Sequence, residues 1–300
     1  MDKILVIGSI NKDFTINVDK APLEGETITS SASSYSLGGK GANQAVALAR
    51  LEAQVDFIGK IGEDNNGYEA IESIQNDGVN MPVILKSQTK DTGIAVIILE
   101  KNGKNRIIVN QGVNLNFNDE DFEIVKKLVD NYDYFLIQLE INVEFIKKLI
   151  NYLHSKKKFI VLNPAPAYHL EDEILKKINL VIPNEHELAI LTNSPNPKNL
   201  DELKVLLKQK ALELKNKWIV TLGEVGSIYM DETNELFCPS LQVEVVDTTA
   251  AGDTYIAAFL KKYLESKDIL GAMQFATKAS AVTISRKGAQ ESLPYLKEIV

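Results

Sequence analysis

The sequence predicts an α/β fold: a mostly parallel central sheet with helices on both faces, similar to a Rossmann fold, and a small antiparallel β-sheet that serves as a lid. Two observations predict this class. Short apolar runs, typical of buried parallel strands, alternate along the chain with amphipathic stretches of helical period. Two pairs of more polar, β-rich segments interrupt this alternation and are typical of a second, solvated sheet.

The predicted buried strands are runs in which apolar residues continue without strict alternation. They lie at residues 3–8, 55–60, 134–139, 159–163, 180–183 and 218–222. The predicted helices between them lie at 41–53, 65–77, 119–130, 143–155 and 200–214. Because strand, helix and strand repeat in this order, we expect a parallel sheet covered on both faces. A further strand at 243–246 leads into helices at 252–264, at 269–285 and from residue 294 onward.

The predicted lid consists of four strands. Two are expected at 14–19 and 26–35, and two at 92–100 and 105–110, where an Asn-Gly turn signals a hairpin. Two independent edge hairpins are the alternative. We assign residues 11–37 and 91–110 to the lid, and residues 1–10, 38–90 and 111–300 to the α/β domain. Open α/β sheets bind ligands at the carboxyl ends of their strands, so a sheet beside those ends would act as a lid.

Composition excludes several classes of function. A formal net charge of −8 argues against a nucleic-acid-binding protein, which would normally carry a basic face. No apolar run approaches the length of a membrane span. A single cysteine, Cys238, excludes an internal disulfide, and with no apolar signal segment at the N-terminus we expect a cytoplasmic protein. The histidines are scattered without metal-ligand spacing, which argues against a zinc site.

The stretch VVDTTAAGDTY, residues 245–255, combines two carboxylates with very small side chains. The first N–H groups of a helix lack internal partners and attract anions. Ala250, Ala251 and Gly252 would leave these groups open to a phosphate, and Asp253 could take a proton from an incoming hydroxyl. The alternative is that Asp253 is a helix-start acid and Asp247 a strand-end cap.

The segment LGGKGANQ contains a second glycine-rich loop before a helix. Its glycines would let the backbone approach a ligand closely, and Asn43 offers both a donor and an acceptor. The spacing is not that of a Walker A loop, and GSINKD, residues 8–13, is not a dinucleotide fingerprint. In GSINKD, Asn11 and Asp13 form a polar pair suited to sugar hydroxyls, with a turn stabilised by an Asx cap as the alternative.

Polar groups also follow three other predicted strands. Glu140 ends the segment QLE, and Asn184 and Glu187 lie three residues apart at a helix start, where both could reach one cation. TLGEVG, residues 221–226, forms a turn open enough to pass over a nucleotide. Each could be ordinary capping, but their joint occurrence at carboxyl ends of parallel strands favours a ligand site.

In this order the motifs resemble those of the PfkB, or ribokinase, family of ATP-dependent carbohydrate kinases. LGGKGANQA and DTTAAGD carry the resemblance, and GSINKD, QLE, NPAP, PNE, TLGEVG and RKGAQ extend it over nearly the whole chain. The resemblance implies a ribokinase-like fold and transfer of the ATP γ-phosphoryl group to O5 of D-ribose. A family member acting on 2-deoxyribose, fructose or adenosine is the alternative, and a sugar sensor is disfavoured because Asp253 is present.

The resemblance also implies roles for individual residues. The sugar site would contain Asn11, Asp13, Gly39, Lys40, Gly41, Ala42, Asn43 and Glu140. Asp253 would be the base, with Ala250, Ala251 and Gly252 as the anion hole. ATP would meet Thr221, Gly223, Gly226, Gly252 and Thr277, while Asn184 and Glu187 would order Mg²⁺. A monovalent cation, K⁺, would lie near Asp247, Thr249, Thr283, Arg286, Gly288 and Ser292.

A homodimer through the lid is implied as well. Two residues depart from the family pattern. Glu224 lies near the expected triphosphate path, and Thr277 stands where His or Asn often meets adenine.

Overall fold

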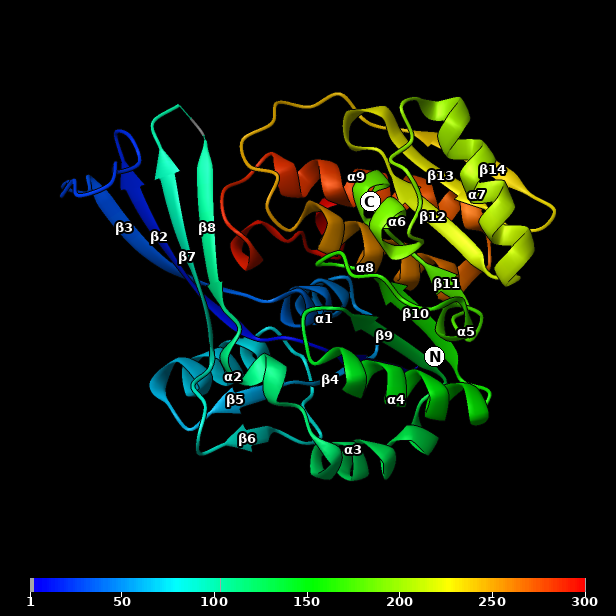
Figure 1. The fold of residues 1–300 in the computed structure, drawn as a ribbon, viewed down its shortest axis with the longest axis horizontal. Helices are drawn as coiled ribbons and strands as arrows, with labels where there is room; N and C mark the ends of the chain where they lie inside the picture. The colour runs from blue at the N-terminus through cyan, green and yellow to red at the C-terminus, as the bar shows by residue number, and fades with distance from the viewer. Residues whose placement is uncertain (1–2, 103, 300) are drawn as a thin grey trace.

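The computed structural model describes residues 3–102 and 104–299, and its architecture is of the predicted class (Figure 1). Within these residues the central sheet has eight strands in the order β14-β13-β12-β11-β10-β9-β1-β4. The strands are β1 Ile4–Ile7, β4 Val55–Ile58, β9 Tyr134–Gln138, β10 Phe159–Asn163, β11 Leu180–Val181, β12 Lys217–Thr221, β13 Gly226–Met230 and β14 Glu235–Pro239. Pairing is parallel from β4 to β12 and antiparallel from β12 to β14.

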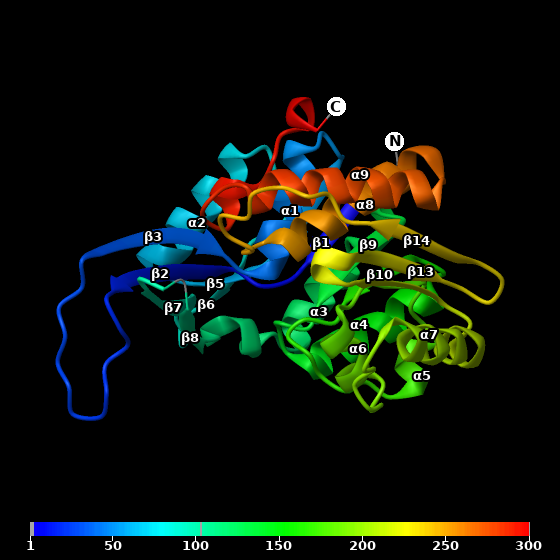
Figure 2. The same ribbon diagram turned by 90° about the horizontal axis from the view of Figure 1, so that it is seen from above.

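Helices cover both faces of this sheet, as predicted (Figure 2). They are α1 Lys40–Arg50, α2 Asn65–Asn76, α3 Asp119–Lys126, α4 Val143–Ser155, α5 Asp172–Leu175, α6 Glu185–Leu191, α7 Leu200–Leu214, α8 Ala251–Ser266 and α9 Ile269–Ile284. Strand β1 shows why two cores form. Ile4 and Val6 pack into the cluster that includes α1, α8 and α9, whereas Leu5 and Ile7 belong to the cluster that includes α3, α4 and α7.

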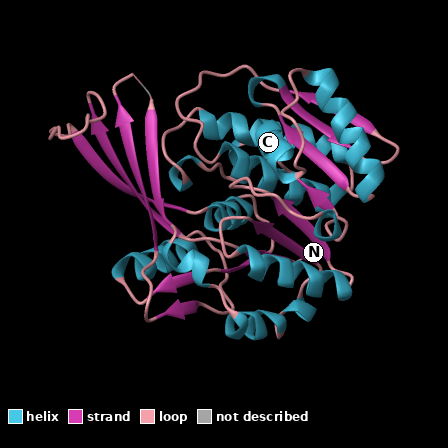
Figure 3. Ribbon diagram, in the orientation of Figure 1, coloured by secondary structure: helices cyan, strands magenta, loops and turns pink. Residues whose placement is uncertain are grey.

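The second sheet has the order β3-β2-β7-β8 and stands clear of the helical layers over most of its length (Figures 1 and 3). Its strands are β2 Asn11–Val18, β3 Ala32–Gly38, β7 Gly93–Glu100 and β8 Asn105–Asn110. One continuous sheet therefore replaces the alternative of two separate hairpins. Gly103 of the predicted Asn-Gly turn lies outside the described residues.

The two hairpins of this sheet are antiparallel as predicted, but its central pair, β2 with β7, is parallel. The reason is that both strands start at the edge of the α/β domain, where Asn11 pairs with Gly93, and run outward together. The strand predicted at 26–35 begins later than expected. Residues 26–31 form no strand, and β3 begins at Ala32.

Other parts of the chain also differ from the prediction. Residues 243–246 form an exposed loop, since the N–H groups of Val246 and Asp247 bind the Ile284 carbonyl at the end of α9 and no sheet neighbour. The helix predicted at 119–130 ends at Lys126 and is followed by a 3₁₀ turn. The sequence did not predict the antiparallel strands β13 and β14, or the small sheet of β5 Lys60–Gly62 and β6 Leu85–Ser87.

Short 3₁₀ helices complete the chain, and the helix expected from residue 294 is one of these. They are η1 Gly112–Asn116, η2 Val129–Asn131, η3 Gly223–Val225, η4 Gln290–Ser292 and η5 Leu296–Glu298. Among the described residues, none of the helices combines the length and the apolar character that a membrane crossing requires.

Candidate active site

The N-terminus of α8 is open, as the small residues of the AAGD segment predict. Ala250 is the N-cap residue, with φ of 60°, and its side chain makes no capping hydrogen bond. A Cβ atom built on Gly252 would meet no described atom within 4 Å. The Ala251 N–H donates to the Thr248 carbonyl at 3.3 Å, which leaves the N–H groups of Gly252 and Asp253 for an anion.

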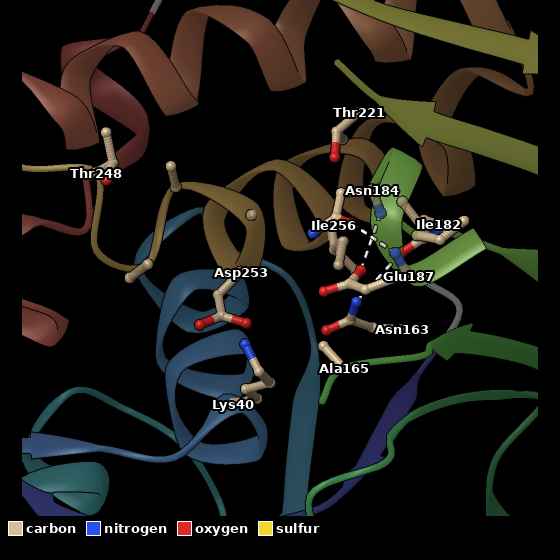
Figure 4. A pocket seen from close by; sticks show the side chains of 14 residues that line it. Lys40, Asn163, Ala165, Ile182, Asn184, Glu187, Thr221, Thr248, Asp253 and Ile256 are labelled. Atoms are coloured by element: carbon tan, nitrogen blue, oxygen red, sulfur yellow. Dashed lines mark hydrogen bonds between the residues drawn. The ribbon is translucent and has the colours of Figure 1, made fainter. Parts of the chain in front are cut away.

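Asp253, in the first turn of α8, is 6% exposed and fixed by two amide side chains. Asn43 Nδ2 donates to its Oδ2 at 3.1 Å, and Gln44 Nε2 donates to its Oδ1 at 2.9 Å. The Lys40 ammonium group points toward this carboxylate across the cavity (Figure 4). The Asp253 charge raises the pKa of Lys40, and this outweighs the opposite effect of burial. An acid and a cation thus face each other at an anion-binding helix end.

The glycines around Lys40 serve the packing of the protein's own backbone. A Cβ on Gly41 would lie 2.6 Å from the Gly8 carbonyl carbon, and one on Gly39 would lie 2.8 Å from the Ser9 carbonyl oxygen. Gly39 also has φ of 89°. Ala42 is buried and donates its N–H to the Ser9 carbonyl. The start of α1 is thereby pressed against the end of β1, which sets the positions of Lys40 and Asn43.

Asn11, Asp13 and Glu140 converge on the same region from two other elements. Glu140 follows β9 and accepts from the Lys40 N–H at 2.8 Å and from Ser9 Oγ at 2.5 Å. Asn11 begins β2, and its Oδ1 accepts from Asn114 Nδ2 at 2.8 Å, which leaves the amide nitrogen available to donate. Burial raises the pKa of Asp13 to about 7, and the negative charges of Glu140 and Glu291 add to this effect.

A cavity joins the Lys40 and Asp253 side chains to other predicted motifs (Figure 4). Four polar residues of the predicted sugar site lie outside its described lining: Asn11, Asp13, Asn43 and Glu140. Its lining residues are Lys40, Asn163, Ala165, Ile182, Pro183, Asn184, Glu187, Thr221, Thr248, Ala250, Ala251, Gly252, Asp253 and Ile256. Asn184 and Glu187 form a reciprocal capping box at the start of α6. Burial raises the pKa of Glu187, whose carboxylate reaches the cavity with one oxygen committed to the Asn184 N–H. The structure therefore brings the AAGD, GGKGAN and PNE motifs together.

Three other residues that were predicted to meet the nucleotide lie outside the described lining of this cavity: Gly223, Gly226 and Thr277. Gly223 has φ of 54° and opens the turn η3 after β12. Gly226 has a structural reason to be glycine, because a Cβ there would lie 2.1 Å from the Cys238 carbonyl oxygen of the paired strand β14. Thr277, on α9, is within 3.5 Å of Cys238 Sγ. Glu224 is exposed, so its carboxylate has solvent available to it.

The residues of the predicted K⁺ site belong to two segments that hydrogen bonds join. Asp247 accepts from the N–H and hydroxyl of Thr249 at 2.9 and 2.7 Å, and from the Gly288 N–H at 3.0 Å. Burial alone would raise the pKa of Asp247, but these hydrogen bonds hold it below its usual range. The Thr283 side chain is fully buried, and its hydroxyl is hydrogen-bonded to the Thr254 hydroxyl. Arg286 forms an ion pair with Glu298 at 2.6 Å. Neither side chain is therefore available to a cation. The Ser292 hydroxyl donates to the Ala289 carbonyl.

A family model for the pfkB family carbohydrate kinases matches residues 1–296. The chain belongs to this family. Its members transfer phosphoryl groups to carbohydrates, and so this chain is a kinase with the ribokinase-like fold that the motifs predicted.

Several relatives of this pfkB-family kinase are similar over the full chain. Ribokinase from Bacillus subtilis is 37% identical over 300 residues, covering 100% of this chain and 98% of the relative. Deoxyribokinase from Salmonella typhimurium is 32% identical, covering 98% of this chain and 96% of the relative. The solved structure of Arabidopsis thaliana ribokinase complexed with ribose and ATP has a TM-score of 0.89 and 29% identity, covering 99% of this chain and 97% of that one.

The sequence did not single out several polar residues that support the site of this pfkB-family kinase. They are Ser9, Gln44, Asn114, Gln138, Asn163 and Glu291. Gln44, Gln138 and Asn163 stand inside the motifs GGKGANQ, QLE and NPAP, so the signal existed as one amide within each motif. Their contacts join segments far apart in the chain, and a linear reading does not reveal those contacts.

Proposed function

We propose that this chain transfers the γ-phosphoryl group of ATP to O5 of D-ribose, giving D-ribose 5-phosphate and ADP. The observation that carries the proposal is the Asp253 carboxylate, held by Asn43 and Gln44 at the open N-terminus of α8 and facing Lys40. Ribose as the acceptor is supported by full-length relatives named ribokinase at 35% and 37% identity. Asn11, Asp13 and Glu140 would bind the sugar hydroxyls from the opposite side.

In the proposed reaction, Asp253 takes the proton of the attacking hydroxyl as the new O–P bond forms and the bond to the ADP oxygen breaks. Phosphoryl transfer requires mainly positioning and charge stabilisation from the protein. The accessible N–H groups of Gly252 and its neighbours would stabilise charge on the transferring group. Lys40 supplies a positive charge on the other side. ATP would extend from the cavity along Thr221, Gly223 and Gly226 toward Thr277.

We also propose that Mg²⁺ accompanies ATP. Mg²⁺ usually needs only one or two carboxylates when phosphates complete its coordination. Glu187 fits this requirement, because its partly buried carboxylate reaches the cavity, where burial raises its pKa against the opposing charge of Lys40. Among the described residues there is no cluster of three acidic, histidine or cysteine side chains that would hold a metal alone. Bound Mg²⁺ would neutralise phosphate charge.

A monovalent cation, K⁺, is proposed beside the anion hole. Asp247 is the ionised group there, and its hydrogen bonds to Thr249 and Gly288 draw the two segments together. With their side chains engaged elsewhere, Thr283, Arg286 and Ser292 would contribute backbone carbonyl groups or fix the loop. The cation would stabilise the loop that leads directly into Ala250 and Ala251.

A panel of ribose, 2-deoxyribose, fructose and adenosine, with coupled detection of ADP, tests the acceptor. We expect saturable turnover at the lowest KM with ribose. The best-supported alternative is 2-deoxyribose, because a deoxyribokinase is 32% identical to this chain. Saturation by 2-deoxyribose with failure of ribose would reject our choice. Each assay is run with K⁺ and with tetramethylammonium in its place, and equal rates in both salts would reject the cation site.

Replacement of the proposed base gives a second test. Asp253→Asn keeps the size of the side chain but cannot accept a proton, so we expect kcat to fall at least about 100-fold. Binding of ribose and ATP, measured by calorimetry, should remain. Near-normal turnover in this variant would remove Asp253 from the mechanism.

A further inference from the structure

Behind Asp253, three buried amide side chains form a connected hydrogen-bonded chain. Gln44 on α1 donates from Nε2 to Asp253 Oδ1 at 2.9 Å and to Asn163 Oδ1 at 3.0 Å. Gln138, the last residue of β9, donates from Nε2 to Gln44 Oε1 at 2.6 Å. Gln44 and Gln138 are 0% exposed and Asn163 is 5% exposed. The chain therefore joins α1, β9 and β10 to the proposed base on α8.

A backbone group fixes the direction of this amide chain. Asn163 Nδ2 donates to the Ile182 carbonyl at 3.2 Å, so Asn163 must present its Oδ1 to Gln44. An oxygen at that position requires a donor, and Gln44 therefore turns Nε2 toward both Asn163 and Asp253. With the amide reversed, Gln44 would present a carbonyl oxygen to a carboxylate, which is repulsive. The Ile182 carbonyl thus determines which atom meets Asp253.

The opposite end of the chain carries an unpaired group. Gln138 Oε1 is buried and has no partner among the described residues. A buried polar atom without a partner is unfavourable, so Gln138 is not arranged for its own best hydrogen bonding. Its Nε2 instead supplies the donor that Gln44 Oε1 needs once Gln44 has turned Nε2 toward Asp253. The unpaired atom lies at the end of the chain remote from the proposed base.

We propose that Gln44 is a positioning residue for Asp253, and that the amide relay of Asn163, Gln44 and Gln138 fixes the orientation of the base. The inference rests on the proposed role of Asp253. Gln44 is fully buried and acts through the carboxylate, so it would affect kcat without contacting sugar or nucleotide. The relay also gives a role to the glutamine of GGKGANQ, the glutamine of QLE and the asparagine of NPAP.

Gln44→Met tests the relay because it keeps the length of the side chain and removes the donor. Hydrogen bonds to a charged group are among the stronger ones, so we expect kcat to fall about tenfold or more. The KM values for ribose and ATP should change little. Lys40 and Glu187, the charged groups that face Asp253, are left in place.

A matched control separates positioning from folding. Asn216 is 5% exposed and donates from Nδ2 to the Leu175 carbonyl at 3.1 Å, and it belongs to neither the relay nor the cavity lining. Asn216→Leu also removes a buried amide, so it should lower the melting temperature without lowering kcat. If Gln44→Met does not fold, Gln44→Glu keeps the size and polarity of the side chain. A carboxylate at this position cannot donate to Asp253 and repels it, so kcat should fall at least as far as in Gln44→Met.

A double-mutant cycle with Asp253→Asn completes the test. Since Gln44 acts through the carboxylate, adding Gln44→Met to Asp253→Asn should cause little further loss of turnover. Equal fold losses in the two backgrounds, or an unchanged kcat in Gln44→Met, would overturn the relay. A loss of turnover in Asp253→Asn would in either case preserve the proposed base. Normal turnover of Asp253→Asn would overturn both.

Discussion

The charge of the Asp13 carboxylate should vary near neutral pH. Burial raises its pKa to about 7, with added repulsion from Glu140 and Glu291. Sugar hydroxyls that donate to Asp13 would favour its ionised form, so sugar binding should weaken as the pH falls through this value. We expect the affinity for ribose, measured by calorimetry without ATP, to fall about tenfold from pH 8 to pH 6.

Two variants separate this effect from other titrating groups. Asp13→Asn should bind ribose weakly at every pH in that range, because its amide does not ionise. Glu291→Gln removes one of the repelling charges, so the midpoint of the pH dependence should move to lower pH. A constant affinity of the unaltered protein between pH 6 and pH 8 would contradict the assignment of Asp13 to the sugar site.

At the scale of elements, two glycines at helix starts have opposite roles. In α1, Gly41→Ala would place a methyl group 2.6 Å from the Gly8 backbone, so we expect a loss of stability of about 1–3 kcal/mol. In α8, Gly252→Ala meets no described atom within 4 Å, so the fold should be at least as stable. Its methyl group would instead crowd the anion site, and kcat should fall about tenfold or more. Thermal unfolding and steady-state kinetics, measured on both variants, distinguish the two outcomes. A destabilised Gly252→Ala protein would show that the start of α8 is packed and not open.

The same elements show what a sequence can and cannot predict about this fold. Continuous apolar runs such as 134–139 and 159–163 identified β9 and β10, because strands buried on both faces are apolar on both faces. Strand β14 escaped notice because it is short and partly exposed, with only Cys238 buried. The apolar residues of 243–246 suggested a strand, yet Val245 is 58% exposed. The pattern of side chains alone cannot distinguish an extended loop from a strand, because a strand also requires a neighbouring strand to which its backbone is hydrogen-bonded.

The residues of the site also fall into those that the sequence predicted and those that it did not. Asp253, Lys40 and Glu140 were predicted because each is a charged group at a strand end or helix start within a recognisable motif. The relay was not predicted, because its members lie far apart in the sequence. Gln44 and Asp253 are 209 positions apart, and Gln44 and Gln138 are 94 positions apart. An amide next to a charged residue has many ordinary roles, and only the three-dimensional contacts select one of them.

At the scale of the whole molecule, the lid is tied directly to the sugar site. Strand β1 continues through Ser9 and Ile10 into β2, and Asn114 bonds both Ile10 and Asn11 from the segment after β8. On β2, Asp13 lies across from Ala95, which pairs with Val109, so these residues share one face of the lid. Ile107, two residues from Val109, lies on that face as well. The lid face that carries Asp13, which is proposed to bind the sugar, thus also carries the apolar side chains of Ile107 and Val109.

We expect this face to form the interface of a homodimer. Ile107 is 55% exposed and Val109 is 44% exposed on the edge strand β8, where a second lid could cover them. Ile107→Lys should convert a species of twice the chain mass into a monomer in analytical ultracentrifugation, because a buried lysine without a partner is strongly disfavoured. The KM for ribose should rise in the same variant, since Asp13 shares this face. Val205→Lys is the control, because Val205 is 69% exposed on α7, remote from the lid (Figure 1). Val205→Lys should keep the mass and the KM of the unaltered protein, and a dimeric Ile107→Lys protein would place the interface elsewhere.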